Sequence, residues 1–177
     1  MIFHHENDDV YPIFNFNDDL LYLFEYTTDM KKEFMLKAIE NAEIAFENGD
    51  VPVGAVIVKD GIIIAEAYNE RELTGRATAH AEILAIERAC TKLGRWRLSD
   101  CEMYVTLEPC TMCAGAILNA RMGKLYYALK DANSGALGSV LNLNSYPLLH
   151  KVQTETGLYE QESRELLSRF FKEKRMK

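Results

Sequence analysis

Apolar runs of strand length alternate with helical patterns along most of the chain, and no other feature constrains the fold as strongly. Strand patterns are predicted over residues 53–58, 62–68, 103–107, 125–129 and 152–156. Helical patterns stand between several of these runs, and alternation of this kind is typical of layered α/β folds. We therefore expect an α/β fold, with a central sheet and helices packed on it.

The helical segments have recognisable starts and stops. The first spans about 29–48, with Asp29 as a plausible N-cap and Gly49 as a stop. A second helix is expected over about 79–93 and a third up to about Ala120, with Pro109 in its first turn. The last helix is expected over about 160–175. Residues 59–61 are expected to form a tight turn, and 70–78 and 131–139 to form loops.

Residues 1–29 differ from the rest of the chain. They hold seven acidic residues and neither Lys nor Arg, and their aromatic residues follow no period. One interpretation is a genuine acidic extension that packs on the body or stays loose. The other is that translation begins at Met30, which we favour because Met30 opens directly into a helical pattern. The domain itself is expected to cover 30–177, a suitable length for one core.

The net charge of −7 argues against nucleic acid, but its distribution does not. Outside 1–29 there are 20 acidic and 20 basic residues, and the chain ends in the basic stretch 172–177. A neutral body with a basic end neither demands an RNA partner nor excludes one. No apolar run approaches the roughly 20 residues of a membrane-spanning helix, and no signal peptide is evident. We therefore expect a cytoplasmic protein.

Two short motifs indicate metal chemistry. His80 and Glu82 lie near one predicted helix start, and Cys110 and Cys113 lie near another. Zinc prefers nitrogen and sulfur ligands, and helix starts favour the thiolate form of cysteine. His80, Cys110 and Cys113 give three ligands and leave a fourth position for water, which is how catalytic zinc sites are built. A carboxylate beside that water, here Glu82, can serve as base and then as acid.

Each motif has an ordinary explanation when taken alone. A single His near a helix start is more often a cap or core residue, and Cys-x-x-Cys also occurs in structural zinc sites and redox pairs. A structural site would be expected to have a fourth Cys or His. The remaining cysteines do not suit that role, because Cys90 falls in mid-helix and Cys101 precedes a strand. The combination therefore favours catalysis.

The combination His-x-Glu with Pro-Cys-x-x-Cys resembles the cytidine deaminase-like zinc deaminases. Within that superfamily the chain is similar to the bacterial tRNA-specific adenosine deaminases, from about Met30 to the C-terminus. The matching stretches are 51–56, Asn69, 78–83, 104–116, 130–139 and Phe170-Phe171 with the basic residues that follow. The resemblance implies a three-layer α/β/α fold with a central mixed sheet of about five strands.

The resemblance also implies a reaction and partners. Water activated by one zinc ion per subunit would attack adenine, with Glu82 as the proton shuttle, and adenosine at the wobble position of a tRNA would become inosine. Asn69 would hydrogen-bond the base and Val53 would help to wall the pocket. Members of the family act as homodimers on the tRNA anticodon loop, so the same is expected here.

Phe170 and Phe171 have two interpretations. They can anchor the last helix to the core, or they can stack on RNA bases, which contributes about 1–3 kcal/mol per base. Adjacent helical residues point about 100° apart, so one can be buried while the other is exposed.

Three rival functions remain. A zinc deaminase of a free base or nucleoside, of guanine or cytosine type, would share the zinc and Glu82. A non-catalytic zinc module would have no use for Glu82, and a redox Cys-x-x-Cys protein would not need the His-x-Glu motif. The basic tail and the matching stretches favour the tRNA enzyme.

Overall fold

The computed structural model describes the backbone of residues 16–176 and the side chains from residue 27 onward. Five strands form one mixed sheet in the order β2-β1-β3-β4-β5. β1 is antiparallel to both β2 and β3, whereas β3, β4 and β5 are mutually parallel neighbours. The strands are β1 (Gly54–Lys59), β2 (Ile62–Tyr68), β3 (Cys101–Leu107), β4 (Lys124–Leu129) and β5 (Gln153–Thr156).

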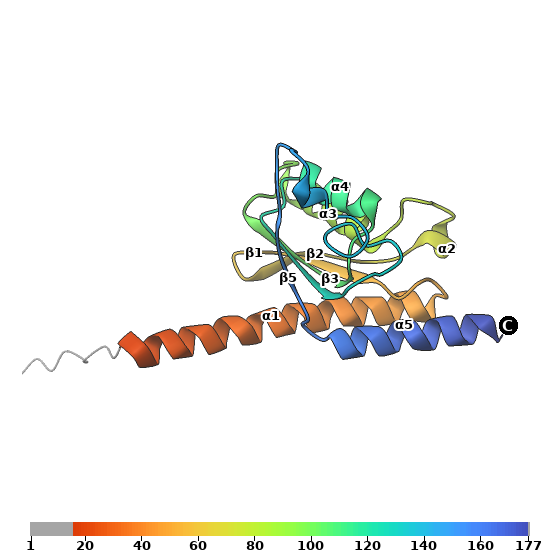
Figure 1. Ribbon diagram of the computed structural model, residues 1–177, viewed down its shortest axis with the longest axis horizontal. Coiled ribbons are helices and arrows are strands. Elements are labelled where there is room, and N and C mark those ends of the chain that lie inside the picture. Colours follow the sequence, from red (N-terminus) through yellow and green to blue (C-terminus); the bar gives the residue numbers. More distant parts are fainter. Residues whose placement is uncertain (1–15, 177) are drawn as a thin grey trace, which may run out of the picture.

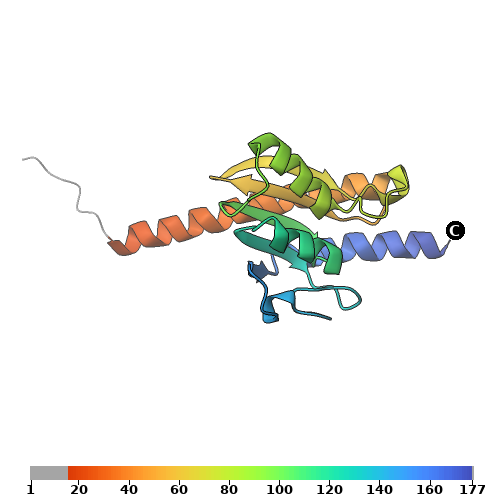
Figure 2. The same ribbon diagram turned by 90° about the horizontal axis from the view of Figure 1, so that it is seen from above.

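Helices cover both faces of the sheet, as Figures 1 and 2 show. α1 (Phe16–Glu47) and α5 (Glu160–Arg175) lie side by side on one face, and α3 (Ala81–Leu93) and α4 (Thr111–Asn119) lie on the other. The remaining elements are the short helix α2 (Arg71–Thr74) and the 3-10 turn η1 (Leu143–Ser145). The expected three-layer α/β/α fold with a five-stranded mixed sheet is therefore confirmed.

Each interlayer space has its own apolar core. Phe34 and Met35 of α1 pack on Val56, Tyr104 and Tyr126 of the sheet. The larger core lies between the opposite face and helices α3 and α4. Alternate residues of β3 thus serve different cores, because successive strand residues point to opposite faces.

Helix α1 approaches the sheet most closely at Gly54. A Cβ at this position would lie 2.0 Å from the backbone oxygen of Ala38 and 2.5 Å from the backbone nitrogen of Ala42. Because glycine has no side chain, the helix backbone can rest directly on the first residue of β1. The preceding residue, Val53, lines the cleft described below.

Three local expectations were wrong. α1 begins at Phe16, so Asp29 lies inside the helix and does not cap it. No Pro or Gly interrupts 16–47, and a helix that has been nucleated extends cheaply through such a stretch. The expected loop 70–78 contains α2, and the third helix begins after Pro109, with Cys110 as its N-cap.

The acidic segment 1–29 falls partly outside the described structure. Residues 1–15 lie outside the described residues, whereas 16–29 form the first turns of α1. Within residues 16–176, no helix is both long enough and apolar enough to cross a membrane.

Candidate metal centre

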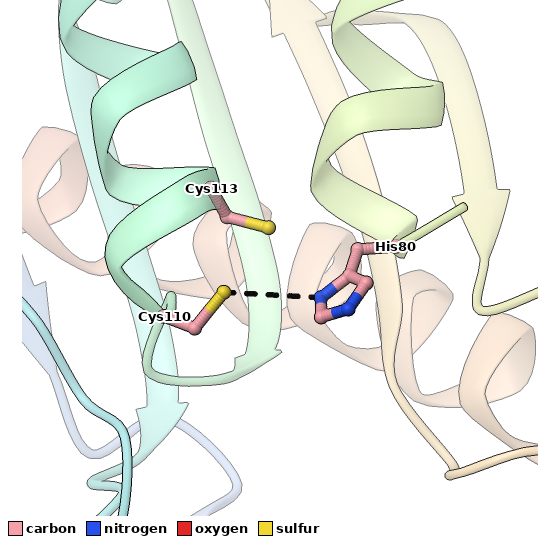
Figure 3. A group of neighbouring side chains, drawn as sticks. All are labelled: His80, Cys110 and Cys113. Carbon is pink, nitrogen blue, oxygen red and sulfur yellow. Dashed lines mark hydrogen bonds between the residues drawn. The ribbon is translucent and has the colours of Figure 1, made fainter. Parts of the chain in front are cut away.

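Two helix starts meet at one end of the sheet. His80 is the N-cap of α3, Cys110 is the N-cap of α4, and Cys113 lies one helical turn further on. Figure 3 shows the imidazole and both thiols pointing into the same space between the two helices. The N-terminal ends of both helices therefore face this space, where their dipoles favour negatively charged ligands.

The three side chains are close enough to share one metal ion. Their ligand atoms all lie within 4.8 Å of one another, and His80 Nδ1 is 3.9 Å from Cys110 Sγ. Ligand atoms of a tetrahedral zinc site stand about 3.5–3.8 Å apart, given zinc–sulfur and zinc–nitrogen distances of about 2.3 and 2.0 Å. Among the described residues, this is the group of His, Cys, Asp or Glu side chains that could hold a metal ion. The donor set fits zinc.

The two thiols differ in how readily they ionise. Hydrogen bonds from Cys113 and from His80 lower the pKa of Cys110 to about 4, which favours the thiolate form that binds metal. The contact with Cys110, together with burial, raises the pKa of Cys113. Metal binding displaces thiol protons, so a divalent cation would convert the second cysteine to its thiolate as well.

Glu82 lies in the first turn of α3, two residues after His80. Its side chain is only 3% exposed, and burial raises the pKa of its carboxyl group above the usual range. Within the described part of the chain, its Oε2 is one of two buried side-chain oxygens with no hydrogen-bond partner. A buried acceptor without a partner is costly, which indicates that this oxygen is kept for a ligand.

A cleft of about 460 Å³ opens beside these residues. Its lining includes the proposed pocket residues Val53 and Asn69, together with His80, Glu82 and Cys110. Asn69 donates a hydrogen bond to the backbone oxygen of Val51 and accepts one from the backbone N–H of Ala81. Beyond these two contacts, an asparagine amide still has a second N–H and a second lone pair. Asn69 can therefore hold the start of α3 and still reach a ligand.

Another part of the cleft lining comes from the 131–139 loop. Its residues Asp131, Ala132, Asn133 and Ser134 line the cleft, beside Lys130. The loop is held by Glu108, whose buried carboxylate accepts backbone hydrogen bonds from its residues. The sequence gives Glu108 no role, because a glutamate between a strand and a Pro-Cys pair carries no signal of its own.

The two adjacent phenylalanines of α5 face different environments. Phe170 is buried, 6% exposed, and its ring meets Phe46 of α1 edge to face at 5.8 Å. Phe171 is 47% exposed and lines the cleft, as does Leu167 one turn before it. Both phenylalanines were candidates for substrate contact, with the alternative that one anchors α5 to the core. The side chain of Phe170 lies in the core and outside the cleft lining, whereas Phe171 lines the cleft.

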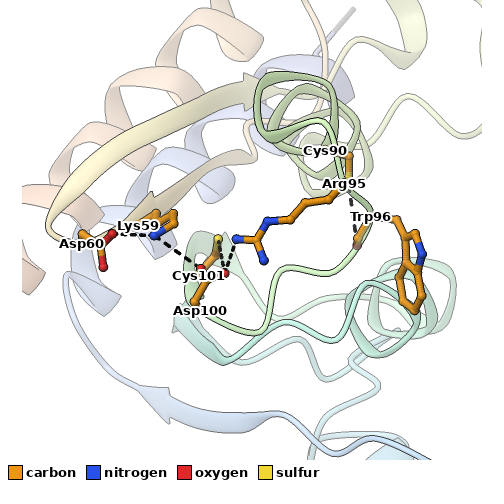
Figure 4. Close-up of polar contacts among 7 residues, drawn as sticks. All are labelled: Lys59, Asp60, Cys90, Arg95, Trp96, Asp100 and Cys101. Atoms are coloured by element: carbon orange, nitrogen blue, oxygen red, sulfur yellow. Dashed lines mark hydrogen bonds and ion pairs between the residues drawn. The ribbon is translucent and has the colours of Figure 1, made fainter.

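The other two cysteines lie away from the metal centre, in the region shown in Figure 4. Cys90 is half-buried in α3, with its thiol 3.8 Å from the backbone oxygen of Trp96. Cys101 is buried at the start of β3, with its thiol 3.6 Å from Asp100. Burial, with the nearby Asp100 carboxylate, raises the pKa of Cys101 to about 11. Neither thiol belongs to the group of side chains that could share a metal ion.

Comparison with known proteins gives consistent results. A family model described as MafB19-like deaminase matches residues 29–175. A tRNA-specific adenosine deaminase of Aquifex aeolicus is 48% identical over 148 residues, covering 82% of this chain and 97% of that relative. A solved chain from a study of A-to-I editing by tRNA:A34 deaminases at the wobble position of transfer RNA is 46% identical, with a TM-score of 0.75. That alignment covers 76% of this chain and 99% of the other.

A guanine deaminase is also similar, with a lower sequence identity and a lower TM-score. Guanine deaminase of Bacillus subtilis is 35% identical, with a TM-score of 0.53, over 66% of this chain and 85% of its own. The fold is therefore also found in a deaminase whose name gives a different substrate.

Proposed function

Since the chain belongs to the tRNA-specific adenosine deaminase family, we propose that it converts adenosine to inosine at the wobble position of a tRNA by hydrolytic deamination. The family resemblance drawn from the sequence is confirmed. The observation that carries the deamination chemistry is the grouping of His80, Cys110 and Cys113 beside a cleft that buried Glu82 also lines.

The three metal-binding side chains would hold one zinc ion. Their donors are two sulfur atoms and one imidazole nitrogen, which is a common zinc set, and three protein ligands leave one position open. A bound zinc ion supplies Lewis acidity that makes water nucleophilic near neutral pH. The lowered pKa of Cys110 favours its thiolate, the form that binds metal.

Glu82 would move the protons of the reaction. Its buried Oε2 is available to accept a proton from the attacking water. The carboxyl group would pass protons to N1 of adenine and then to the departing amino group. The oxygen of water bonds to C6, the bond from C6 to the amino nitrogen breaks, and ammonia leaves, which balances the conversion of adenine to hypoxanthine.

The cleft would orient the base. Asn69 has hydrogen-bonding capacity beyond its contacts to Val51 and Ala81, so its amide can pair with an edge of the purine. Val53 supplies an apolar wall beside it. A base in a splayed anticodon loop reaches such a cleft at a lower unstacking cost than a base in a duplex.

The anticodon loop would lie across the open side of the cleft. Phe171 presents an exposed ring there, and Arg71 and Lys130 are cations in the cleft lining. α5 ends in Lys172, Lys174 and Arg175, which would meet phosphates. Lys174 also lies 5.3 Å from the ring centre of Phe170, so part of its surface already packs on the protein.

A homodimer is also proposed. Exposed apolar side chains gather in the segment after the 131–139 loop: Val140, Leu141, Tyr146, Leu148 and Leu149. Leu148 and Leu149 also line a cavity of about 340 Å³ with Leu118 of α4. Monomers rarely leave such a cluster uncovered, which supports a second copy as its partner. A tRNA substrate further supports action in the cytoplasm.

The decisive experiment offers the zinc-loaded full chain an anticodon stem-loop with a wobble adenosine. Free adenine, adenosine, guanine and cytosine run in parallel, with inosine and ammonia as readouts. Inosine in the stem-loop alone, lost in Glu82→Ala, supports the proposal. Ammonia from guanine or another free base, with the stem-loop unchanged, would instead favour a deaminase of free bases. The similarity to guanine deaminase is the reason for including this alternative.

A further inference from the structure

We propose that Glu108 is a positioning residue, whose buried carboxylate fixes the 131–139 loop on the metal-binding turn and so sets one wall of the substrate cleft. The identity of the substrate rests on the function proposed above. The contact between Glu108 and the loop does not, so the two ideas can fail separately.

The carboxylate of Glu108 is fully engaged by the loop. Its side chain is 2% exposed. Oε1 accepts hydrogen bonds from the backbone N–H groups of Leu137 at 3.0 Å and Ser139 at 3.1 Å. Oε2 accepts from the backbone N–H of Asp131 at 3.1 Å and from the hydroxyl group of Ser139. All four partners are donors, which suits a carboxylate and does not suit an amide.

The loop also lies in direct contact with the turn that carries Glu108. A Cβ on Gly135 would stand 2.5 Å from the carboxyl carbon of Glu108, so this close approach requires glycine. The backbone N–H of Ala136 donates to the oxygen of Pro109 at 2.9 Å, and Gly135 forms an isolated bridge with Cys110. The loop therefore follows the turn from Glu108 to Cys110.

The anchors bracket the segment that faces the substrate. Asp131 on one side and Leu137 with Ser139 on the other are tied to Glu108, and the cleft-lining residues 132–134 lie between them. Cys110, a proposed metal ligand, follows Glu108 by two residues. The turn from Glu108 to Cys110 thus carries both a proposed metal ligand and the support of this part of the cleft lining, which restricts how far the two can move apart.

Loss of this support should affect substrate binding more than the chemical step. An unanchored loop samples several positions, and the apparent affinity for the substrate falls in proportion to the fraction of molecules whose loop is in the binding-competent position. At saturating concentration the substrate shifts the loop back to that position, so kcat is largely retained. We therefore expect Glu108→Gln to raise KM for the stem-loop by about tenfold while kcat changes by less than about threefold.

The test uses the zinc-loaded full chain and measures amide hydrogen exchange across residues 131–139, zinc content and steady-state kinetics. In Glu108→Gln, exchange at Asp131, Leu137 and Ser139 should accelerate while zinc content stays at the wild-type level. Ser139→Ala, which removes only the hydroxyl donor, should give a smaller change in the same direction. The matched controls are Glu102→Gln and Ser145→Ala, whose side chains bond Tyr104 and Asn142.

Unchanged exchange in both Glu108→Gln and Ser139→Ala would overturn the proposal. Loss of zinc from Glu108→Gln would do so too, because Glu108 would then act through the metal turn. If Glu108→Gln fails to fold, the exchange of Ser139→Ala decides the question. If the wild-type protein leaves the stem-loop unchanged, the proposed function fails while the exchange data still judge the role of Glu108.

Discussion

Phe170 and Phe171 are neighbours in sequence, and their rings meet edge to face with centroids 5.4 Å apart, yet one belongs to the core and the other to the cleft. Phe170 packs on Phe46 of α1, whereas Phe171 lines the cleft together with the proposed metal ligands His80 and Cys110. The buried ring thus supports the exposed one.

This pair gives a matched test of stability against binding. Phe171→Ala should weaken stem-loop binding by about 1–3 kcal/mol, the contribution of one stacked base, with little effect on the melting temperature. Phe170→Ala should lower the free energy of unfolding by about 3–5 kcal/mol, because it opens a cavity between α1 and α5. Binding titrations and thermal melts of both variants check this, and equal effects of the two on binding would contradict it.

Glu82→Gln should lower kcat by a factor of about 10²–10⁴ or more, since the amide cannot relay protons. Zinc content should be unchanged, because the proposed ligands are His80, Cys110 and Cys113. Stem-loop affinity should also remain, as the shape of the side chain is kept. Single-turnover kinetics, metal analysis and binding measurements on the same preparation separate these effects. A variant that retains wild-type kcat would remove Glu82 from the mechanism.

Chelation of the metal should abolish deamination, and added zinc should restore it. At a free zinc concentration about 1,000 times the dissociation constant, the ion should stabilise the fold by about 4 kcal/mol, so the chelated protein should melt at a lower temperature. Cys113→Ser should reproduce this loss. Cys90→Ser serves as the control, because the Cys90 thiol lies near Trp96 and outside the metal group; it should retain zinc.

Gly54→Ala should destabilise the protein by about 3 kcal/mol, because the added methyl group would collide with the backbone of α1. Gly115→Ala is the control: this residue lies within α4, and a Cβ there would meet no atom within 4 Å. That change should be neutral or stabilise the helix by about 0.5–1 kcal/mol. Denaturant unfolding of both variants provides the measurement.

Removal of residues 1–29 should preserve deamination and, if anything, tighten RNA binding. The segment carries seven acidic residues and no Lys or Arg, so its loss leaves a chain without net charge. The truncation should weaken the repulsion of phosphates, and the resulting gain in affinity should be largest at low salt, where screening is least. A salt series of stem-loop affinities checks this. Loss of folding in the truncated protein would show instead that residues 30–177 need the first turns of α1 in order to fold.

The sequence predicted those elements whose limits are set by local chemistry. The strand 62–68 was predicted with the limits of β2, because the turn at Asp60-Gly61 leaves little choice of register. The candidate metal-binding residues were identifiable because zinc requires few residue types at short fixed spacings, and the structure brings His80, Cys110 and Cys113 together. In both cases short local motifs carry the signal.

Other features depend on packing between distant segments. Asp29 has the chemistry of an N-cap, but α1 continues through it because nothing upstream breaks a helix. The separate roles of Phe170 and Phe171 follow from where α5 rests on α1, and the role of Glu108 follows from a loop that returns more than 20 residues later. Sequence patterns carry no information about such meetings.

The placement of α5 beside α1 also bears on how the cleft forms. α5 supplies Phe171 and Leu167 to the cleft, and it packs against α1, which lies far away in the sequence. The cleft therefore gains this wall only when these two distant helices have docked. A folding intermediate in which α5 is undocked would lack the wall, so RNA editing would depend on this long-range contact.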